Sequence, residues 1–195
     1  MERSRVITFG AAIMGLWLIF VAYWFVAAMR VKRSVSSARW RGGIFRAALA
    51  IGVFLLIRAS FRGHVWRVVP LAATSVSPVA ASVGVALCAL GIAVAIWART
   101  YLGRNWGMPM SLREGHELVT TGPYAFVRHP IYTGILLAVV GTTLVRGLPW
   151  IVLLAALFAY FVYAATVEER SMLGQFPNEY PAYVNRTKML IPFLF

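Results

Sequence analysis

Two short polar stretches carry side chains that could do chemistry at the edge of apolar segments. The first is GPYAFVRHPIYTG, residues 122–134, where Arg128, His129 and Tyr132 stand at the start of a long apolar run. The second is the pair Glu168–Glu169, which directly follows another apolar run. A buried carboxylate can bind a cation, and an imidazole or carboxylate can take up a proton. These residue types therefore indicate a polar pocket placed against hydrocarbon.

The same residues also have a purely anchoring interpretation. Basic residues before a span can follow charge bias, and tyrosines there can belong to an aromatic belt. The glutamates fit this interpretation poorly, because acids contribute little to topology and are costly near hydrocarbon. A helix that ended at Val167 would also place them against its C-terminal dipole. We therefore expect this helix to run on to about Gln175, with Glu168 pointing inward to a cation.

The elements that must position these residues are membrane helices. The chain is 61% hydrophobic and 13% charged, whereas a soluble domain is about half apolar and about a quarter charged. Its net charge of +13 comes from basic residues that lie between apolar runs, and no zinc-finger or RNA-binding signature is present. Such charge sets topology and meets anionic lipid headgroups, so we expect those partners and no nucleic acid.

We predict an all-α integral membrane protein with a single domain, residues 1–195, and about five transmembrane helices. A helix needs about 20 apolar residues to cross a bilayer. The predicted spans are approximately residues 6–29, 44–60, 79–98, 131–146 and 148–167. The third span is rich in small residues, which favours close helix packing. In the tail, Pro177 and Pro181 preclude one continuous helix.

The last two spans are joined by RGLPW, which predicts an antiparallel helical hairpin. Its two outer ends lie on one side of the membrane, so His129 and Glu168 should face each other. The basic residues concentrate in residues 30–43, 99–130 and 168–195. The positive-inside rule then places the N-terminus outside. We expect a multi-pass protein whose active-site pocket faces the cytosol and is formed by the 99–130 loop and the C-terminal segment.

Several familiar site signatures are absent from the sequence. It contains no Gly-rich dinucleotide fingerprint, Walker loop or HExxH motif, and its three histidines lack metal-ligand spacing. We therefore assign no metal. Cys88 is the only cysteine and lies within a predicted span, where we expect it to pack as a small apolar residue.

From about Asn105 onward, the sequence resembles the isoprenylcysteine carboxyl methyltransferase family of integral-membrane, S-adenosyl-L-methionine-dependent enzymes. The resemblance rests on GHELVTTGPYAFVRHPIYTG before the hairpin and EERSMLGQFPNEYPAYVNRTKMLIPF after it. The same pattern occurs in phospholipid methyltransferases and, distantly, in sterol reductases. The resemblance implies that residues 105–195 form the cofactor-binding half. Carried over by motif, the cofactor contacts are His116, Glu117, Leu118, Val119, Tyr124, His129, Pro130, Ile131, Tyr132 and Glu168.

These residue types suit such a cofactor. Tyrosine faces can pack against adenine, histidine can hydrogen-bond a carboxylate, and Glu168 can pair with the amino group of the cofactor. Methyl transfer from a sulfonium needs alignment and exclusion of water. An ionised carboxylate acceptor needs no base, whereas an amine or phenol would need one, for which Glu169 or His129 are candidates. The predicted catalytic residues are Arg128, His129 and Glu169, with Arg128 adding positive charge for a carboxylate or a headgroup.

The sequence departs from the isoprenylcysteine enzymes at one substrate position. Where they carry an arginine four residues before the first glutamate of the pair, this chain has Ala164. We expect an apolar volume there, lined by neighbours such as Tyr160, Phe161 and Tyr163 according to their helix phase. A bulky hydrophobic acceptor would then be held mainly by burial.

We predict methyl transfer from S-adenosyl-L-methionine to a membrane lipid or lipidated small molecule at the membrane–cytosol interface. The favoured reaction is carboxyl O-methylation of an isoprenylcysteine-like or other isoprenoid lipid. The alternatives are N-methylation of a phospholipid amine, an NADPH-dependent sterol-type reductase and a non-enzymatic membrane adaptor. The identity of the acceptor and the oligomeric state stay open at this stage.

Overall fold

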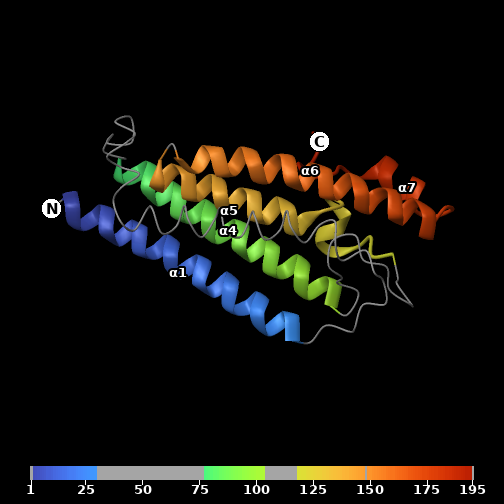
Figure 1. Ribbon diagram of the computed structural model, residues 1–195, viewed down its shortest axis with the longest axis horizontal. Helices are drawn as coiled ribbons and strands as arrows, with labels where there is room; N and C mark the ends of the chain where they lie inside the picture. Colours follow the sequence, from blue (N-terminus) through green and yellow to red (C-terminus); the bar gives the residue numbers. More distant parts are fainter. Residues whose placement is uncertain (1, 30–76, 104–117, 148, 195) are drawn as a thin grey trace.

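The computed structural model describes residues 2–29, 77–103, 118–147 and 149–194, and helices make up all of the regular elements in these ranges (Figure 1). The predicted second span, 44–60, lies outside the described residues. The helices are α1 (Glu2–Met29), α4 (Pro78–Leu102), η3 (Gly122–Ala125), α5 (Pro130–Arg146), α6 (Pro149–Gln175) and α7 (Tyr180–Arg186). The predicted all-α class is confirmed for this part of the chain.

The four long helices lie side by side as an elongated bundle (Figure 1). Helix α4 packs against α5 and also against α1, and α6 packs on the other side of α5. Helices α1, α4 and α6 run in one direction and α5 runs in the other. The end of α6, the beginning of α5, η3 and α7 therefore gather at one end of the bundle. The shared direction of α1 and α4 agrees with a five-span topology, which stays a prediction.

Three of the described helices are long and apolar enough to cross a membrane, with candidate spans Thr8–Ala27, Pro78–Leu102 and Trp150–Gln175. Helix α5 is also apolar but shorter, with 17 residues, which gives a length of about 25 Å. Large apolar side chains point outward, such as Phe25, Val79 and Val152, which are 69%, 74% and 73% exposed. This pattern is typical of helices solvated by lipid, and the chain is a multi-pass membrane protein.

Glycines bring the backbones of α4 and α5 into contact. A Cβ added to Gly134 would lie 2.6 Å from the carbonyl oxygen of Gly91, and one added to Gly84 would lie 2.7 Å from that of Gly141. Real Cβ atoms do not approach other atoms so closely. Cys88 is fully buried in the same interface, as predicted for a small packing residue. The close packing expected for the third span is confirmed, and it fixes the position of α5.

The hairpin and the length of α6 agree with the sequence-based predictions, whereas the predicted end of α4 does not. Gly147 ends α5 with φ 82°, a left-handed conformation that glycine adopts without strain. Helix α6 continues to Gln175, as expected. The loop predicted from residue 99 was wrong for its first residues, because α4 continues to Leu102. Arg99 is buried within this helix, and its guanidinium donates to the carbonyls of Gly103 and Ala27.

Candidate active site

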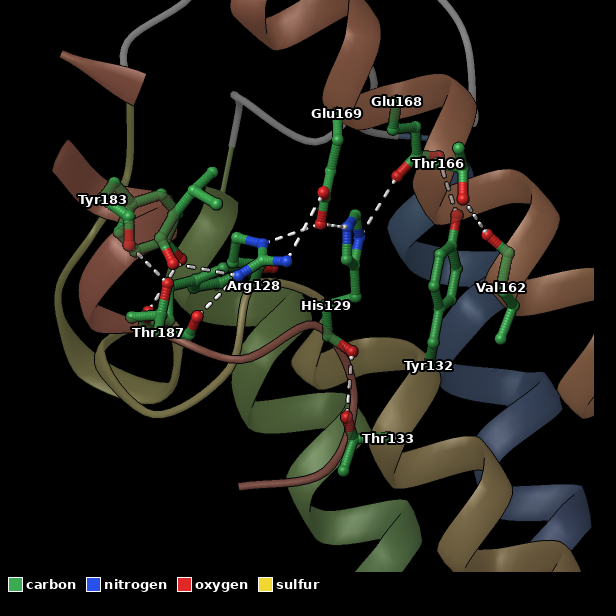
Figure 2. A network of polar contacts seen from close by, with 12 residues as sticks. Arg128, His129, Tyr132, Thr133, Val162, Thr166, Glu168, Glu169, Tyr183 and Thr187 are labelled. Atoms are coloured by element: carbon green, nitrogen blue, oxygen red, sulfur yellow. Dashed lines mark hydrogen bonds and ion pairs between the residues drawn. The ribbon is translucent and has the colours of Figure 1, made fainter. Parts of the chain in front are cut away.

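Polar residues gather where α5 begins and α6 ends (Figure 2). His129 caps the N-terminus of α5, and Pro130 is its first residue, a position for which the fixed φ of proline is suited. The carbonyl of His129 accepts hydrogen bonds from the backbone and the hydroxyl of Thr133, at 3.1 and 3.2 Å. The start of this helix thus holds the backbone of His129 at the edge of the membrane segment.

The C-terminal tail runs alongside the segment that precedes α5. Val127 forms an isolated parallel bridge with Lys188. The backbone N–H of Arg128 donates to the carbonyl of Lys188 at 2.8 Å, and that of His129 donates to Met189 at 3.1 Å. One residue further along the tail, the fully buried Leu190 packs against α5 and α6. The tail is therefore part of the wall of the site.

Arg128 ties this tail to α6. Its Nε lies 2.7 Å from Oε1 of Glu169, and its Nη2 lies 3.4 Å from Oε2. Its Nη1 donates to the carbonyls of Thr187, at 2.6 Å, and Val184, at 3.4 Å. The side chains of Arg128 and Glu169 are only 9% and 15% exposed. A guanidinium suits this place because its planar fork can serve a carboxylate and backbone carbonyls together.

His129 lies between the two glutamates. Its Nδ1 is 3.4 Å from Oε2 of Glu168, and its Nε2 is 3.3 Å from Oε1 of Glu169. Burial alone would lower the pKa of His129, but the hydrogen bonds and negative charges of both glutamates outweigh it and raise this pKa above 6.5. The sequence-based expectation that His129 and Glu168 face each other is confirmed.

A stack of three rings leads from this cluster into the apolar part of the bundle. The rings of His129 and Tyr132 are parallel within 5°, with centroids 5.4 Å apart. Tyr132 also stacks on Phe161 of α6, with centroids 4.4 Å apart. The hydroxyl of Tyr132 donates to Oε1 of Glu168 at 2.7 Å. Tyr132 is therefore anchored at its polar end by Glu168 and on its faces by two other rings.

Behind the cluster, η3 is fastened to α7. The hydroxyl of Tyr183 donates to the carbonyl of Tyr124 at 2.7 Å, and the hydroxyl of Thr187 donates to the carbonyl of Tyr183 at 2.7 Å. Burial raises the pKa of Tyr183 to about 12, so its phenol stays protonated at neutral pH and acts as a donor. These bonds tie the segment before Arg128 to the tail at a second place.

The structure brings together five of the residues that the sequence singled out: Arg128, His129, Tyr132, Glu168 and Glu169. Pro130 is fully buried, while Ile131, Leu118 and Val119 are partly exposed beside the cluster or before η3. Tyr124 is 7% exposed and lies next to α4, with its hydroxyl donating to the carbonyl of Ala98. His116 and Glu117 lie outside the described residues. Contact of any of these residues with a cofactor stays a prediction.

The structure shows how the side chain of Ala164 is placed, while the apolar volume expected beside it stays a prediction. This side chain is fully buried, and Tyr163 beside it is 62% exposed and points away from the bundle. The reason is helix phase, since residues 161, 164, 165 and 168 share one face of α6 and residue 163 lies on another. Phe161 fills this inner face with its ring stacked on Tyr132.

Sequence reasoning missed the contribution of two threonines. The hydroxyl of Thr133 lies 2.6 Å from the carbonyl of Leu190 and so holds the tail, and the buried Thr187 ends α7 with its hydroxyl donating to the carbonyl of Tyr183. For Thr133 a weak signal existed, because a hydroxyl four residues after the cap, on an apolar helix, needs an acceptor. For Thr187 no comparable signal was present.

Comparison with known proteins gives concordant likenesses. Residues 79–179 match the model of the phospholipid methyltransferase family. The chain is 32% identical over 160 residues to the cobalt-zinc-cadmium resistance protein CzcN of Cupriavidus metallidurans, covering 80% of this chain and 65% of that protein. It is 35% identical over 81 residues to the protein-S-isoprenylcysteine O-methyltransferase of Saccharomyces cerevisiae, covering 40% of this chain and 34% of that enzyme. This chain thus spans less than two thirds of either relative.

A solved structure supports the same fold. The structure of the eukaryotic intramembrane Ras methyltransferase ICMT (isoprenylcysteine carboxyl methyltransferase) superposes with a TM-score of 0.64 at 23% sequence identity. The match covers 97% of this chain and 68% of that one. At this identity the likeness concerns the arrangement of the helices.

Proposed function

The chain belongs to the phospholipid methyltransferase family, whose sequence pattern is shared by the isoprenylcysteine enzymes that it resembles, and from this premise we propose that it transfers a methyl group from S-adenosyl-L-methionine to a lipophilic acceptor. The observation that carries the proposal is the polar cluster at the open end of the α5–α6 hairpin, opposite the joint between the two helices. There Glu168, His129 and Tyr132 meet where the end of α6 reaches the beginning of α5. The resistance named for CzcN is a phenotype and does not by itself indicate a reaction.

The residues present fit the methionyl end of the cofactor. The Glu168 side chain is 22% exposed, whereas that of Glu169 is 15% exposed and paired with Arg128. Each oxygen of an ionised carboxylate can accept two hydrogen bonds, so Glu168 keeps acceptor capacity beyond Tyr132 and His129. Glu168 would hold the ammonium group of the cofactor, and the neighbouring aromatic faces would pack against its rings. The cofactor supplies an electrophilic methyl group on its sulfonium.

The protein then has to align the acceptor and exclude water, since displacement at a sulfonium needs little acid–base chemistry. An acceptor that reaches the site from the bilayer would pass apolar side chains, of which the lipid-facing surface of the helices offers many. We propose an isoprenylcysteine-like acid as the acceptor, as in the yeast relative. Its carboxylate is already ionised and needs no base.

A phospholipid amine is the second candidate acceptor. The matched family model favours it, and so does Ala164, which leaves α6 without the arginine that an acidic acceptor would use. In both cases the proposed site faces the cytosol, where S-adenosyl-L-methionine is made. The basic residues of the tail and of the 99–130 segment support this orientation.

The test is ligand binding to the detergent-purified protein by calorimetry. S-adenosylhomocysteine should bind, and Glu168→Gln should weaken it by about 2 kcal/mol, or roughly 30-fold, through the loss of a charge-assisted bond. Glu179→Gln is the matched control, because Glu179 is exposed on the same polar segment. Binding of NADPH in place of S-adenosylhomocysteine would indicate a reductase, and binding of neither would favour an adaptor.

The acceptor is identified by a transfer assay. Membranes containing the protein are incubated with methyl-labelled cofactor and total lipids, and the labelled product is identified by mass spectrometry. We expect label in a prenylated acid or in an amine headgroup. A protein that binds S-adenosylhomocysteine but labels no lipid or prenylated compound would contradict the lipophilic acceptor.

A further inference from the structure

Both ring nitrogens of His129 face carboxylates. Nδ1 is 3.4 Å from Oε2 of Glu168, and Nε2 is 3.3 Å from Oε1 of Glu169 (Figure 2). A neutral imidazole has one N–H, so its other nitrogen would turn a lone pair toward a carboxylate oxygen. The imidazolium form donates from both nitrogens and satisfies both glutamates. This geometry selects the charged ring.

The groups around the ring favour the same form. Among the described residues, the charged groups that face it are Glu168 and Glu169 of α6, with Arg128 next to it in the chain and bound to Glu169. From α5, Tyr132 stacks on the ring and donates to Glu168. The tail contributes the carbonyl of Met189, which accepts from the backbone of His129. The two glutamates raise the pKa of His129 despite its burial.

The two glutamates have different partners. Oε1 of Glu169 accepts hydrogen bonds from Arg128 and His129, and Oε2 of Glu169 accepts a second one from Arg128. Oε1 of Glu168 accepts a hydrogen bond from the Tyr132 hydroxyl, and Oε2 of Glu168 faces Nδ1 of His129. Glu169 is therefore held by Arg128 and His129, whereas Glu168 is the more exposed of the two and is oriented by Tyr132 and His129.

We infer that His129 is a positioning residue, a doubly donating imidazolium that aims Glu168 at a cationic group of the ligand, and that it is not a general base. The inference rests on the proposed function, in which that cation is the ammonium group of the cofactor. No proton moves in this role, so it adds nothing to the proton balance of the transfer. It differs from the role of base, for which the sequence made His129 and Glu169 candidates if the acceptor is an amine or phenol.

The two roles predict opposite pH dependences. If His129 aims Glu168, loss of its proton removes the hydrogen bond from the ring to one of the two glutamates, and affinity for a ligand with an ammonium group falls as the pH rises. If His129 is a base, turnover rises with pH as the ring becomes neutral. The same linkage acts on folding: the stabilisation from protonated His129 is complete below pH 6.5 and is lost as the pH rises through the raised pKa.

The experiment measures the dissociation constant of S-adenosylhomocysteine from about pH 6 to about pH 9, because the two glutamates raise the pKa of His129 above its ordinary value. For the wild-type protein we expect affinity to fall by about tenfold toward high pH, as one charge-assisted bond is lost. The control ligand is methylthioadenosine, which lacks the ammonium and carboxylate groups. Its affinity should not change with pH. A flat profile for S-adenosylhomocysteine, or turnover that rises with pH at constant affinity, would overturn the inference.

Two substitutions separate the nitrogens of the ring. The amide nitrogen of His129→Asn stands near Nδ1 and keeps a donor for Glu168, while that of His129→Gln stands near Nε2 and keeps a donor for Glu169. We expect His129→Asn to bind S-adenosylhomocysteine at least about fivefold more tightly than His129→Gln, with no pH dependence in either. Equal losses in both would contradict the role of Nδ1. If neither ligand binds even the wild-type protein, the proposed function fails, which is a different outcome.

Discussion

Replacement of Arg128 by methionine should loosen the C-terminal tail and destabilise the protein. The guanidinium contacts Oε1 of Glu169 at 2.7 Å and the carbonyl of Thr187 at 2.6 Å, and only 9% of the Arg128 side chain is exposed. Methionine has a similar reach and keeps most of the apolar packing of the stem, but it donates no hydrogen bond. The substitution therefore isolates the polar contribution of Arg128.

The size of the effect follows from the groups left behind. Removal of one partner from a buried ion pair costs about 3–5 kcal/mol, because the other charge stays buried. Glu169 is 15% exposed and keeps His129 as a partner, which argues for the lower end of that range. We expect a loss of about 3 kcal/mol in the free energy of unfolding. Arg128→Lys should lose less, since an ammonium keeps the charge but cannot serve Glu169 and two carbonyls together.

The assay is equilibrium unfolding in mixed micelles, combined with hydrogen exchange of the backbone amides of Arg128 and His129. These amides donate to the tail carbonyls of Lys188 and Met189, so they should exchange faster when the tail detaches. Arg170→Met is the matched control, because Arg170 is next to Glu169 on α6 but is exposed. The reasoning is refuted if Arg128→Met unfolds no more easily than Arg170→Met and leaves the exchange of these amides unchanged.

The remaining predictions concern the bundle and its orientation. Gly134→Val should disrupt the contact of α5 with α4 and lower the unfolding temperature by several degrees, because its Cβ would overlap the backbone of α4. Gly15→Val is the control and should be tolerated, because no atom lies within 4 Å of its added Cβ. Equal unfolding temperatures of the two variants would contradict this packing. Asn178→Cys should resist labelling by an impermeant maleimide in intact cells and react after permeabilisation. Ser77→Cys, at the other end of the bundle, should react in intact cells. The reverse pattern would place the site away from the cytosol.

The hairpin and the meeting of its two polar ends could be predicted because they depend on local signals. Apolar runs define α5 and α6, the short joint makes them antiparallel, and Pro177 stops α6 after Gln175. Two helices of a hairpin bring their outer ends together whatever their side chains are. For this reason the approach of His129 to Glu168 was predictable without any knowledge of the core.

The pairing of the tail could not be predicted in the same way. Residues 127–129 pair with residues 188–189 through backbone N–H and carbonyl groups, which every residue except proline carries. The sequence therefore holds no side-chain signal for this contact. Arg128 was expected to add positive charge for a carboxylate or a headgroup, while in the structure its guanidinium donates to Glu169 and to the tail carbonyl of Thr187.

The order of residues in RHPIYT explains how so many polar groups are kept beside hydrocarbon. Pro130 starts the helix, which sets Tyr132 and Thr133 about one turn from His129, on the side where α6 and the tail pass. Arg128, just before the helix, turns to Glu169 and the tail, while the His129 ring reaches both glutamates. Because hydrocarbon offers no hydrogen bonds, each of these groups must find its partner within the protein. Glu168 is the member of this cluster whose partners orient it without enclosing it, and it is therefore the group best placed to meet a cationic ligand.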